Sequence, residues 1–406
     1  MNRLISGLLL ILSVFLYPTP GTGESIQKKF IIGGWVGPHQ TEEQFLLFKQ
    51  AGFNTVLDYP FEGDKYQKTL ELAQKVGGLD VILNIDHQFL RYKPEPFVPF
   101  ERISAFVKQV KGNKNIIGYM MFDEPRSTDV ALLVAAENHV RFLDPARLTW
   151  VDFHPDSAGG LAHSILEKMK PSVISFPYYP YCTKSVKLDQ FYTLTEKYRN
   201  LSIEFGKPLW LFVQSASWPW PQDRNEDRRL PTPSEIRMQV YSDLAYGAKA
   251  LWYYTYVTPR HAKEITSAIL DKDDKTKPAY AGIKAINAEV QALAPVLMSL
   301  NSVDVMHVKP NHLGVKPFTP NNVIADIQAE NLLIGFYKDN AGVDYFMLVN
   351  KLAQGVNRNI RIKLQSKVKG LSQVDRISGR PVVYPMNNGL AVVSLEPGDG
   401  MLFKVN

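Results

Sequence analysis

Residues 100–125 read FERISAFVKQVKGNKNIIGYMMFDEP, and this stretch contains both kinds of element from which the fold is built. Its first half predicts an amphipathic helix, because apolar residues recur at i, i+3, i+4 and i+7: Ile103, Phe106, Val107 and Val110. Its second half contains a short, apolar, β-rich run at 116–122, which predicts a buried strand. Helices alternating with buried strands are typical of α/β proteins with a parallel sheet.

The same alternation extends in both directions from this stretch. Seven more strand candidates occur, at 30–36, 54–59, 79–86, 148–154, 173–179, 209–215 and 250–256. Amphipathic segments separate them, and the eighth helix is expected at about 279–300. Two helix starts carry capping boxes, Thr41-x-x-Gln44 and Thr232-x-x-Glu235. Eight strand and helix units predict a (β/α)8 TIM barrel over residues 28–300 better than an open doubly wound sheet.

After residue 300 the pattern changes to alternating runs without helices between them: 333–337, 344–349, 360–362 and 391–395. Residues 301–406 are therefore expected to form a C-terminal antiparallel β-sandwich packed on the barrel. The predicted fold class is α/β, a TIM barrel followed by a β-domain.

The composition limits the partners. The chain has 46 Lys and Arg against 40 Asp and Glu, and no basic run is interleaved with aromatic residues, so nucleic acid is not expected as a partner. The single cysteine, Cys182, excludes an internal disulfide and a cysteine-based metal cluster. No Gly-rich phosphate loop or His-Glu-x-x-His motif occurs. We expect no cofactor and no metal.

The N-terminal residues predict a compartment. Arg3 precedes an apolar run at 4–17, and small residues follow at 19–23, which is the layout of a signal peptide over residues 1–23. The run is too short to cross a bilayer comfortably. We expect a secreted or periplasmic protein with no stable membrane insertion after cleavage. A membrane anchor or a buried first helix is the alternative.

Polar and aromatic residues stand at nearly every predicted strand end. In a TIM barrel these ends surround the mouth where substrates bind. Carboxylates accept hydrogen bonds from sugar hydroxyls, and aromatic rings cover the apolar face of a pyranose. The expected substrate-binding residues are Trp35, Asp58, Asp86, Asp152, His154, Tyr178, Gln214 and Tyr254. Asp152 and His154 could instead bind a divalent ion, and some of the eight could be turn residues.

The fourth strand ends in Asp123-Glu124-Pro125, and this motif carries the predicted chemistry. Two adjacent carboxylates repel each other, so one pKa should rise and leave a protonated acid near neutral pH. A glycosidase needs such an acid to protonate the leaving oxygen. The alternative is a surface pair that caps the following helix.

The seventh strand ends in Gln214, and an amide cannot act as a nucleophile. The following loop contains Asp223, Glu226 and Asp227, which could cover a substrate. For each of these acids a solvated loop position is favoured.

This organisation resembles the clan A glycoside hydrolases, in which a barrel strand 4 carries Asn-Glu-Pro. The resemblance implies that Glu124 is the acid/base residue, but the chain departs from that clan at Asp123 and Gln214. The Asp-Glu pair is also similar to that of the substrate-assisted hexosaminidases. There the acetamido oxygen of the substrate attacks, the Asp orients that group and the Glu protonates the leaving oxygen. The resemblance therefore predicts a glycoside hydrolase acting on an oligo- or polysaccharide, with Glu124 and Asp123 as catalytic residues. The alternative is a catalytically degenerate barrel that binds carbohydrate.

Overall fold

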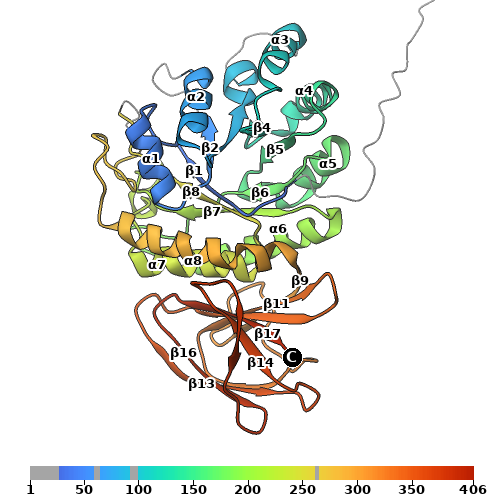
Figure 1. Cartoon of the computed structure of the whole chain (residues 1–406), viewed down its shortest axis with the longest axis vertical. Helices are drawn as coiled ribbons and strands as arrows, with labels where there is room; N and C mark the ends of the chain where they lie inside the picture. The colour runs from blue at the N-terminus through green and yellow to red at the C-terminus, as the bar shows by residue number, and fades with distance from the viewer. Residues whose placement is uncertain (1–26, 59–64, 92–98, 261–264) are drawn as a thin grey trace, which may run out of the picture.

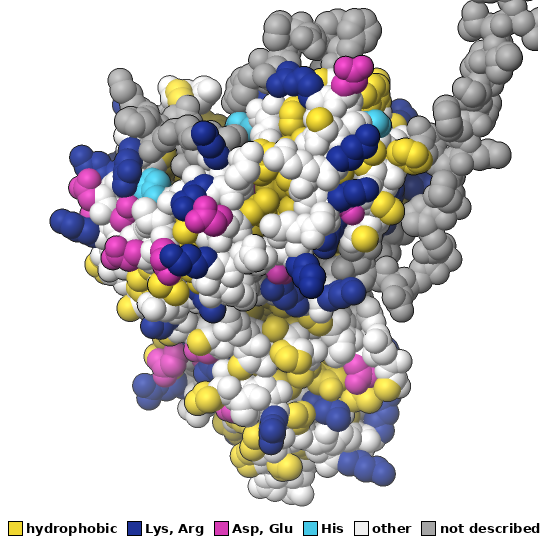
Figure 2. Space-filling model, turned by 45° about the horizontal axis from the view of Figure 1, so that its top comes forward, with side chains coloured by type: hydrophobic (Ala, Val, Ile, Leu, Met, Phe, Trp, Pro, Cys, Tyr) yellow, Lys and Arg dark blue, Asp and Glu magenta, His cyan; other side chains and the backbone are white. Residues whose placement is uncertain are grey.

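The computed structural model describes residues 27–58, 65–91, 99–260 and 265–406. The predicted signal peptide at 1–23 lies outside these ranges. In Figure 1 a ring of helices surrounds the strands of the upper part, and a body of strands lies below α7 and α8. Within the described ranges, none of the helices has the length and apolarity that a membrane span requires. Over the face seen in Figure 2, basic and acidic side chains are interspersed.

Eight parallel strands form a closed barrel in chain order, in which β8 pairs with β1. The strands are β1 Ile31–Trp35, β2 Thr55–Asp58, β3 Asp80–Asn84, β4 Ile116–Asp123, β5 Leu148–Asp152, β6 Ile174–Phe176, β7 Leu209–Gln214 and β8 Ala250–Tyr254. The predicted TIM barrel is confirmed. Some predicted strands were too long, because Pro177 has no amide hydrogen to continue β6 and a π-helical turn begins at Asp86.

Eight helices alternate with these strands: α1 Glu42–Gln50, α2 Tyr66–Val76, α3 Phe100–Val110, α4 Val130–Leu143, α5 Gly160–Met169, α6 Leu188–Phe205, α7 Pro233–Ala245 and α8 Ala279–Ser299. Four short turns of helix also occur: η1 Asp86–Leu90, η2 Ser127–Asp129, η3 Pro155–Ala158 and η4 Arg224–Glu226. The capping box at α7 is complete, with Thr232 and Glu235 each accepting from the other's backbone N–H. At α1 only Thr41 caps, accepting from the backbone of Gln44.

Aromatic side chains fill the inside of the barrel. Trp150 stacks on Trp252 with ring centroids 4.7 Å apart, and Trp210 lies 5.1 Å from Trp150. Gly33 leaves room for this stack, since a Cβ at that position would lie 2.2 Å from the Trp252 ring. The barrel is thus a packed core, and a substrate must bind above it, at one end.

The C-terminal part contains two antiparallel sheets, one with the order β15-β14-β17-β12-β11-β9 and one with the order β10-β13-β16. Their strands are β9 Leu300–Val308, β10 Ile324–Gln328, β11 Leu332–Asp339, β12 Asp344–Asn350, β13 Asn357–Leu364, β14 Leu371–Val374, β15 Pro381–Tyr384, β16 Leu390–Leu395 and β17 Gly400–Val405. An apolar core lies between the sheets, as the prediction of a β-sandwich required. Alternation identified only four of these strands, because the others are short or lack a regular alternation of apolar and polar residues.

The six-stranded sheet packs closely against α7 and α8 of the barrel (Figure 1). The Tyr337 hydroxyl donates to the carbonyl of Leu244, 2.7 Å away. Arg237 on α7 forms ion pairs with Glu289 on α8 and with Asp399 of the β-domain. The two parts therefore share a polar and an apolar interface.

Candidate active site

A pocket of about 790 Å³ lies at the carboxyl ends of β4 and β5. It is lined by the last two residues of β4 and by residues that follow β3, β4 and β5: Arg91, Phe122, Asp123, Glu124, Pro125, Arg126, Ser127, Thr128, Asp129, His154, Ser157 and Leu161. The predicted catalytic pair and His154 are among them. This is the end of a TIM barrel at which enzymes carry out their chemistry.

A bulge at Met121 decides where Asp123 points. Met120 pairs in register with Trp150, but Asp123 pairs with Asp152, so β4 contains one extra residue between the two pairs. Simple alternation from Met120 would have placed Phe122 beside Asp152. Because residues in register on parallel strands share a face, the bulge places Asp123 on the same face as Asp152.

Glu124 follows the bulge in an uncommon backbone conformation. Its φ is 53°, in the left-handed region, and its backbone N–H donates to the carbonyl of Asp152, 2.8 Å away. This conformation costs a residue with a Cβ roughly 1–2 kcal/mol. The side chain is exposed on the rim of the pocket. Such strain is concentrated at functional sites, where the surrounding structure holds it in place.

Arg91 and Asp86 hold the backbone of Asp123. The fully buried Asp86 accepts, on one carboxylate oxygen, from Arg91 Nε at 2.7 Å and from the N–H of Asp123 at 3.1 Å. Arg91 Nη2 donates to the carbonyl of Asp123 and lies 3.6 Å from its carboxylate. The Arg91 guanidinium also lies over the ring of Phe122, 5.2 Å from its centroid. Asp123 is thus held at its N–H and its C=O.

The acids at this end have raised pKa values. Burial raises the pKa of Asp86 to about 6, and the charge of Arg91 opposes the rise. Burial also raises the pKa of Asp123, against the effect of Arg91, while Glu124 and Asp86 raise it further. The pKa of Glu124 is raised mainly by the desolvation of its carboxyl group, although part of the residue stays open to solvent. These shifts favour the protonated forms of all three acids.

Asp152 is the last residue of β5, His154 follows the strand, and the two differ in exposure. Asp152 is buried and accepts from the Ser175 hydroxyl, and the indole N–H of Trp150 donates to that hydroxyl. Burial and the charge of Asp123 raise the pKa of Asp152 well above its ordinary value. The imidazole of His154 is 48% exposed and accepts from the N–H of Asp156 at 3.2 Å. Within the described ranges, no three His, Cys, Asp or Glu side chains are grouped as a metal ion requires.

Gln214 does not face the pocket. Its carboxamide is fully buried and donates to the carbonyls of Tyr181 and Arg229, at 3.0 and 2.8 Å. Its oxygen accepts from the N–H of Tyr181 at 2.8 Å. The prediction that Gln214 binds substrate needs correction, because both amide hydrogens already hold the loops that follow β6 and β7.

Two other predicted residues point away from the pocket. Asp58 is buried and accepts from the Thr69 hydroxyl on α2 at 2.8 Å, so it faces the helix layer. Trp35 is only 5% exposed and packs against Trp150 and Phe212 inside the barrel. Buried side chains with such contacts are not surfaces for a sugar, and neither Asp58 nor Trp35 is among the residues that line the pocket beside β4.

Tyr178 follows β6, and Tyr254 is the last residue of β8. The Tyr178 hydroxyl donates to Gln190 on α6. The Tyr254 ring lies 4.9 Å from Tyr179 and 5.1 Å from Trp218, so these three rings form an aromatic cluster. Neither Tyr178 nor Tyr254 lines the pocket beside β4.

Sequence reasoning missed two residues of the site. Tyr179 is close enough to Asp152 and Glu124 for their charges to raise its pKa, in addition to burial. Its signal was available, since Tyr179 stands in the aromatic pair that follows β6. Arg91 had no such signal, because it reaches the site through a π-helical turn in which its N–H bonds to the carbonyl of Asp86 at 2.9 Å.

The acids of the β7 loop are occupied by contacts within the loops. Asp223 accepts from the N–H of Asn225, and Asp227 accepts from the N–H of Trp220. Glu226 forms an ion pair with Lys187 at 2.7 Å. These contacts agree with the prediction of loop positions for all three.

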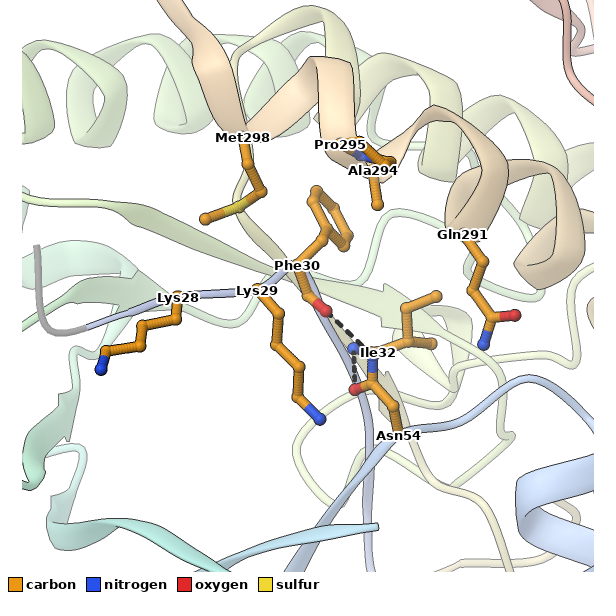
Figure 3. Close-up of a pocket in the computed structure, with 9 residues that line it drawn as sticks. All are labelled: Lys28, Lys29, Phe30, Ile32, Asn54, Gln291, Ala294, Pro295 and Met298. Carbon is orange, nitrogen blue, oxygen red and sulfur yellow. Dashed lines mark hydrogen bonds between the residues drawn. The ribbon is translucent and has the colours of Figure 1, made fainter. Parts of the chain in front are cut away.

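A second hollow, of about 470 Å³, lies at the other end of the barrel, between the start of β1 and α8 (Figure 3). Asn54 lines it, and its amide bonds to the backbone at Phe30 and Ile32, as the dashed lines show. No carboxylate is among the described residues that line it. This hollow therefore lacks the acids that glycoside hydrolysis needs.

Comparisons with known proteins agree with this picture. A family model named Glyco_hydro_42 and described as Beta-galactosidase matches residues 137–293, which cover β5 to β8 but not the Asp123-Glu124 motif. This part of the barrel is similar in sequence to that family of glycoside hydrolases, in agreement with the prediction of a glycosidase. No curated protein sequence matches the chain significantly.

Solved structures of glycoside hydrolases share the fold at low identity. The β-galactosidase from Bacillus circulans sp. alkalophilus matches 93% of this chain and 99% of its own, with 9% identity and a TM-score of 0.64. A glycoside hydrolase family 5 protein from Bacteroides vulgatus ATCC 8482 matches 93% and 89%, with 12% identity and a TM-score of 0.60. The β-galactosidase from the psychrophilic Marinomonas ef1 matches 68% of this chain at 12% identity and a TM-score of 0.52. This chain covers 63% of that protein's length.

Proposed function

We propose that this protein is a secreted or periplasmic glycoside hydrolase that cleaves O-glycosidic bonds of a carbohydrate, with Glu124 as the general acid/base. The carboxyl pair Asp123-Glu124 at the end of β4, beside a pocket of about 790 Å³, carries this proposal. The family match over 137–293 supports it, and the N-terminal pattern at 1–23 supports export.

In this proposal Glu124 protonates the leaving oxygen as the glycosidic bond breaks. Its exposed position on the pocket rim makes it accessible, and desolvation raises its pKa, which favours the protonated form that a general acid needs. In the second step the Glu124 carboxylate takes a proton from the water that attacks the anomeric carbon.

The nucleophile in this proposal is the acetamido oxygen of the substrate. Support comes from β7, where Gln214 is held by backbone groups, and from the loop acids, which are engaged elsewhere. The acetamido oxygen forms a bond to the anomeric carbon while the leaving oxygen receives the proton of Glu124. Asp123 accepts the acetamide N–H, and its negative charge stabilises the cyclic oxazolinium intermediate. The names of the matching family and neighbours suggest a β-galactoside as the first hexoside to compare.

Hydrolysis of a panel of aryl glycosides tests the proposal. The panel pairs each β-hexoside, the galactoside included, with its N-acetylated analogue. We expect turnover of at least one pair, with the N-acetylated member faster, and tight inhibition by a thiazoline mimic of the cyclic intermediate. Turnover of hexosides without the acetamide alone would contradict substrate assistance. Absence of all turnover would contradict the proposal that the protein is a glycoside hydrolase.

The second candidate is a barrel that binds carbohydrate without cleaving it. Gln214 stands at the position of the clan A nucleophile, and both hydrogens of its amide are already donated to backbone carbonyls, which favours this alternative. Binding of unmodified oligosaccharides by calorimetry, together with no release of reducing ends, would identify it.

A further inference from the structure

Arg91 forms the widest set of contacts with the catalytic segment. It contacts the carbonyl of Asp123, approaches its carboxylate and covers Phe122. Its Nε bonds to Asp86, which in turn accepts from the N–H of Asp123. The planar guanidinium can make these contacts at once because its donors form a rigid fork.

The hydrogen bonds of Arg91 and Asp86 to the backbone of Asp123, which we call the clamp, act where the backbone of β4 and the residue after it is irregular. The bulge at Met121 interrupts the pairing of β4 with β5, and Glu124 has a left-handed φ two residues after Phe122. Hydrogen bonds to both backbone groups of Asp123 fix the residue between these two irregular points. A loss of the clamp would therefore allow the carboxyl pair to change orientation.

We propose that Arg91 and Asp86 are positioning residues, which aim the Asp123-Glu124 pair into the pocket and hold the charge balance of that pair through the guanidinium of Arg91. This proposal rests on the proposed function, because positioning has an effect on turnover only if the pair is catalytic. Neither residue needs to touch the substrate.

Charged groups from every neighbouring element contribute to the balance. The turn after β3 supplies Asp86, Arg91 and the imidazole of His87, whose pKa burial lowers to about 4. The strand β5 supplies Asp152, and the segment after it supplies His154 and Asp156. The turn before α4 supplies Asp129. Arg91 is the cation that lowers the pKa of Asp86, Asp123 and Glu124 alike.

The test compares Arg91→Gln, which removes charge and fork, with Arg91→Lys, which keeps the charge. We expect Arg91→Gln to lower kcat on the order of a hundredfold, since small misplacements of reacting groups have such effects. The limb of the pH profile that reports the carboxyl pair should move to higher pH by about one to three units, because a nearby positive charge is lost. Arg91→Lys should keep the limb in place and show a smaller fall in kcat.

Arg141→Gln is the matched control. Arg141 is 26% exposed, like Arg91, and pairs with the fully buried Glu137 just as Arg91 pairs with Asp86, but on the outer helix α4. The control should lose stability as Arg91→Gln does, without a shift of the pH limb. If Arg91→Gln and Arg141→Gln behave alike in the pH profile, the positioning role is overturned.

A second measurement does not depend on turnover. Carbon-13 NMR of labelled aspartate carboxyl groups, with Asp123 assigned through Asp123→Asn, follows its titration directly in the wild type and in Arg91→Gln. We expect the Asp123 signal to titrate at a higher pH in the variant. An unchanged titration of Asp123 overturns the inference even in an active enzyme. A shifted titration in a protein without turnover supports the role of Arg91 beside Asp123 and contradicts the proposed function.

Discussion

At the amino-terminal end of the barrel the side chains of Asn54 and Gln27 have hydrogen-bond partners, whereas at the carboxyl-terminal end one oxygen of the buried Asp86 lacks one among the described residues. Asn54 donates to the carbonyl of Phe30 and accepts from the N–H of Ile32, and Gln27 bonds to Lys249 and Trp210. At the mouth, one oxygen of the buried Asp86 has no hydrogen-bond partner among the described residues. Polar groups with a full set of hydrogen-bond partners stabilise a fold. Acids that lack a partner and have raised pKa values are available for chemistry.

The comparison predicts that substitutions at the mouth change activity and that substitutions at the other end change stability. The largest expected effect is that of Glu124→Gln, which should lower kcat by roughly a hundred- to ten-thousandfold with little change in unfolding, because the amide cannot transfer a proton. Steady-state kinetics and denaturant unfolding measure both. Glu226→Gln, on the β7 loop, is the control, and equal activity of the two variants would remove Glu124 as the acid.

Asp123→Asn sharpens the comparison within the mouth itself. If Asp123 offsets the positive charge of an oxazolinium, the variant should lose on the order of a hundred- to a thousandfold in kcat on N-acetylated aryl glycosides. On substrates without the acetamide the loss should be much smaller. An equal loss on both members of a pair would assign Asp123 a role other than substrate assistance.

Gln214→Glu tests whether this residue at the carboxyl-terminal end contributes to stability, as the polar residues at the amino-terminal end do, and not to turnover. A carboxylate there would face the carbonyls of Tyr181 and Arg229, and an uncompensated buried charge costs about 3–5 kcal/mol. We expect a lower free energy of unfolding and no gain in turnover. Gln190→Glu, at an exposed position on α6, should be nearly neutral. A gain in turnover of Gln214→Glu would instead indicate a clan A mechanism.

Asp86→Asn should remove a pH dependence of stability that belongs to the mouth. The folded state raises the pKa of Asp86 from 3.8 to about 6, so it binds a proton more tightly than the unfolded state. The contribution of Asp86 to the free energy of unfolding is therefore largest at low pH and declines by about 3 kcal/mol as the pH rises from about 4 to 6. Denaturant unfolding between these pH values should show a flatter profile for the variant. Parallel profiles would contradict the shift.

The smallest effect on stability is expected at the amino-terminal end of the barrel. Asn54→Ala removes the side-chain partners of Phe30 and Ile32 and should lower the free energy of unfolding by about 1–3 kcal/mol. Because the hollow there lies at the opposite end from the carboxyl pair, kcat at a temperature where the variant is folded should equal that of the wild type. A fall in kcat beyond the unfolded fraction would break the comparison between the two ends.

The period of the hydrophobic pattern was sufficient to predict the barrel and the β-domain. An apolar stripe at i, i+3, i+4 and i+7 encodes a helix locally, and the run at 116–122 encodes a buried strand, so eight repeats determine the class of fold. The position of Asp123-Glu124 at a strand end followed from the same pattern. Predictions for single side chains were less complete, since Trp35 and Asp58 stand at strand ends but point into the core and toward α2.

The sequence by itself determined the order of elements and which strand ends carry acids, because these depend on local periodicity. The tertiary structure decided which acids meet. The bulge at Met121 arises in the pairing with β5 and turns Asp123 toward Asp152, and the π-helical turn brings Arg91 to Asp123. Gln214 has a structural role because its amide donates hydrogen bonds to the loops that follow β6 and β7. A hydrogen bond or a charge shift needs a partner from elsewhere in the chain, and local sequence does not specify that partner.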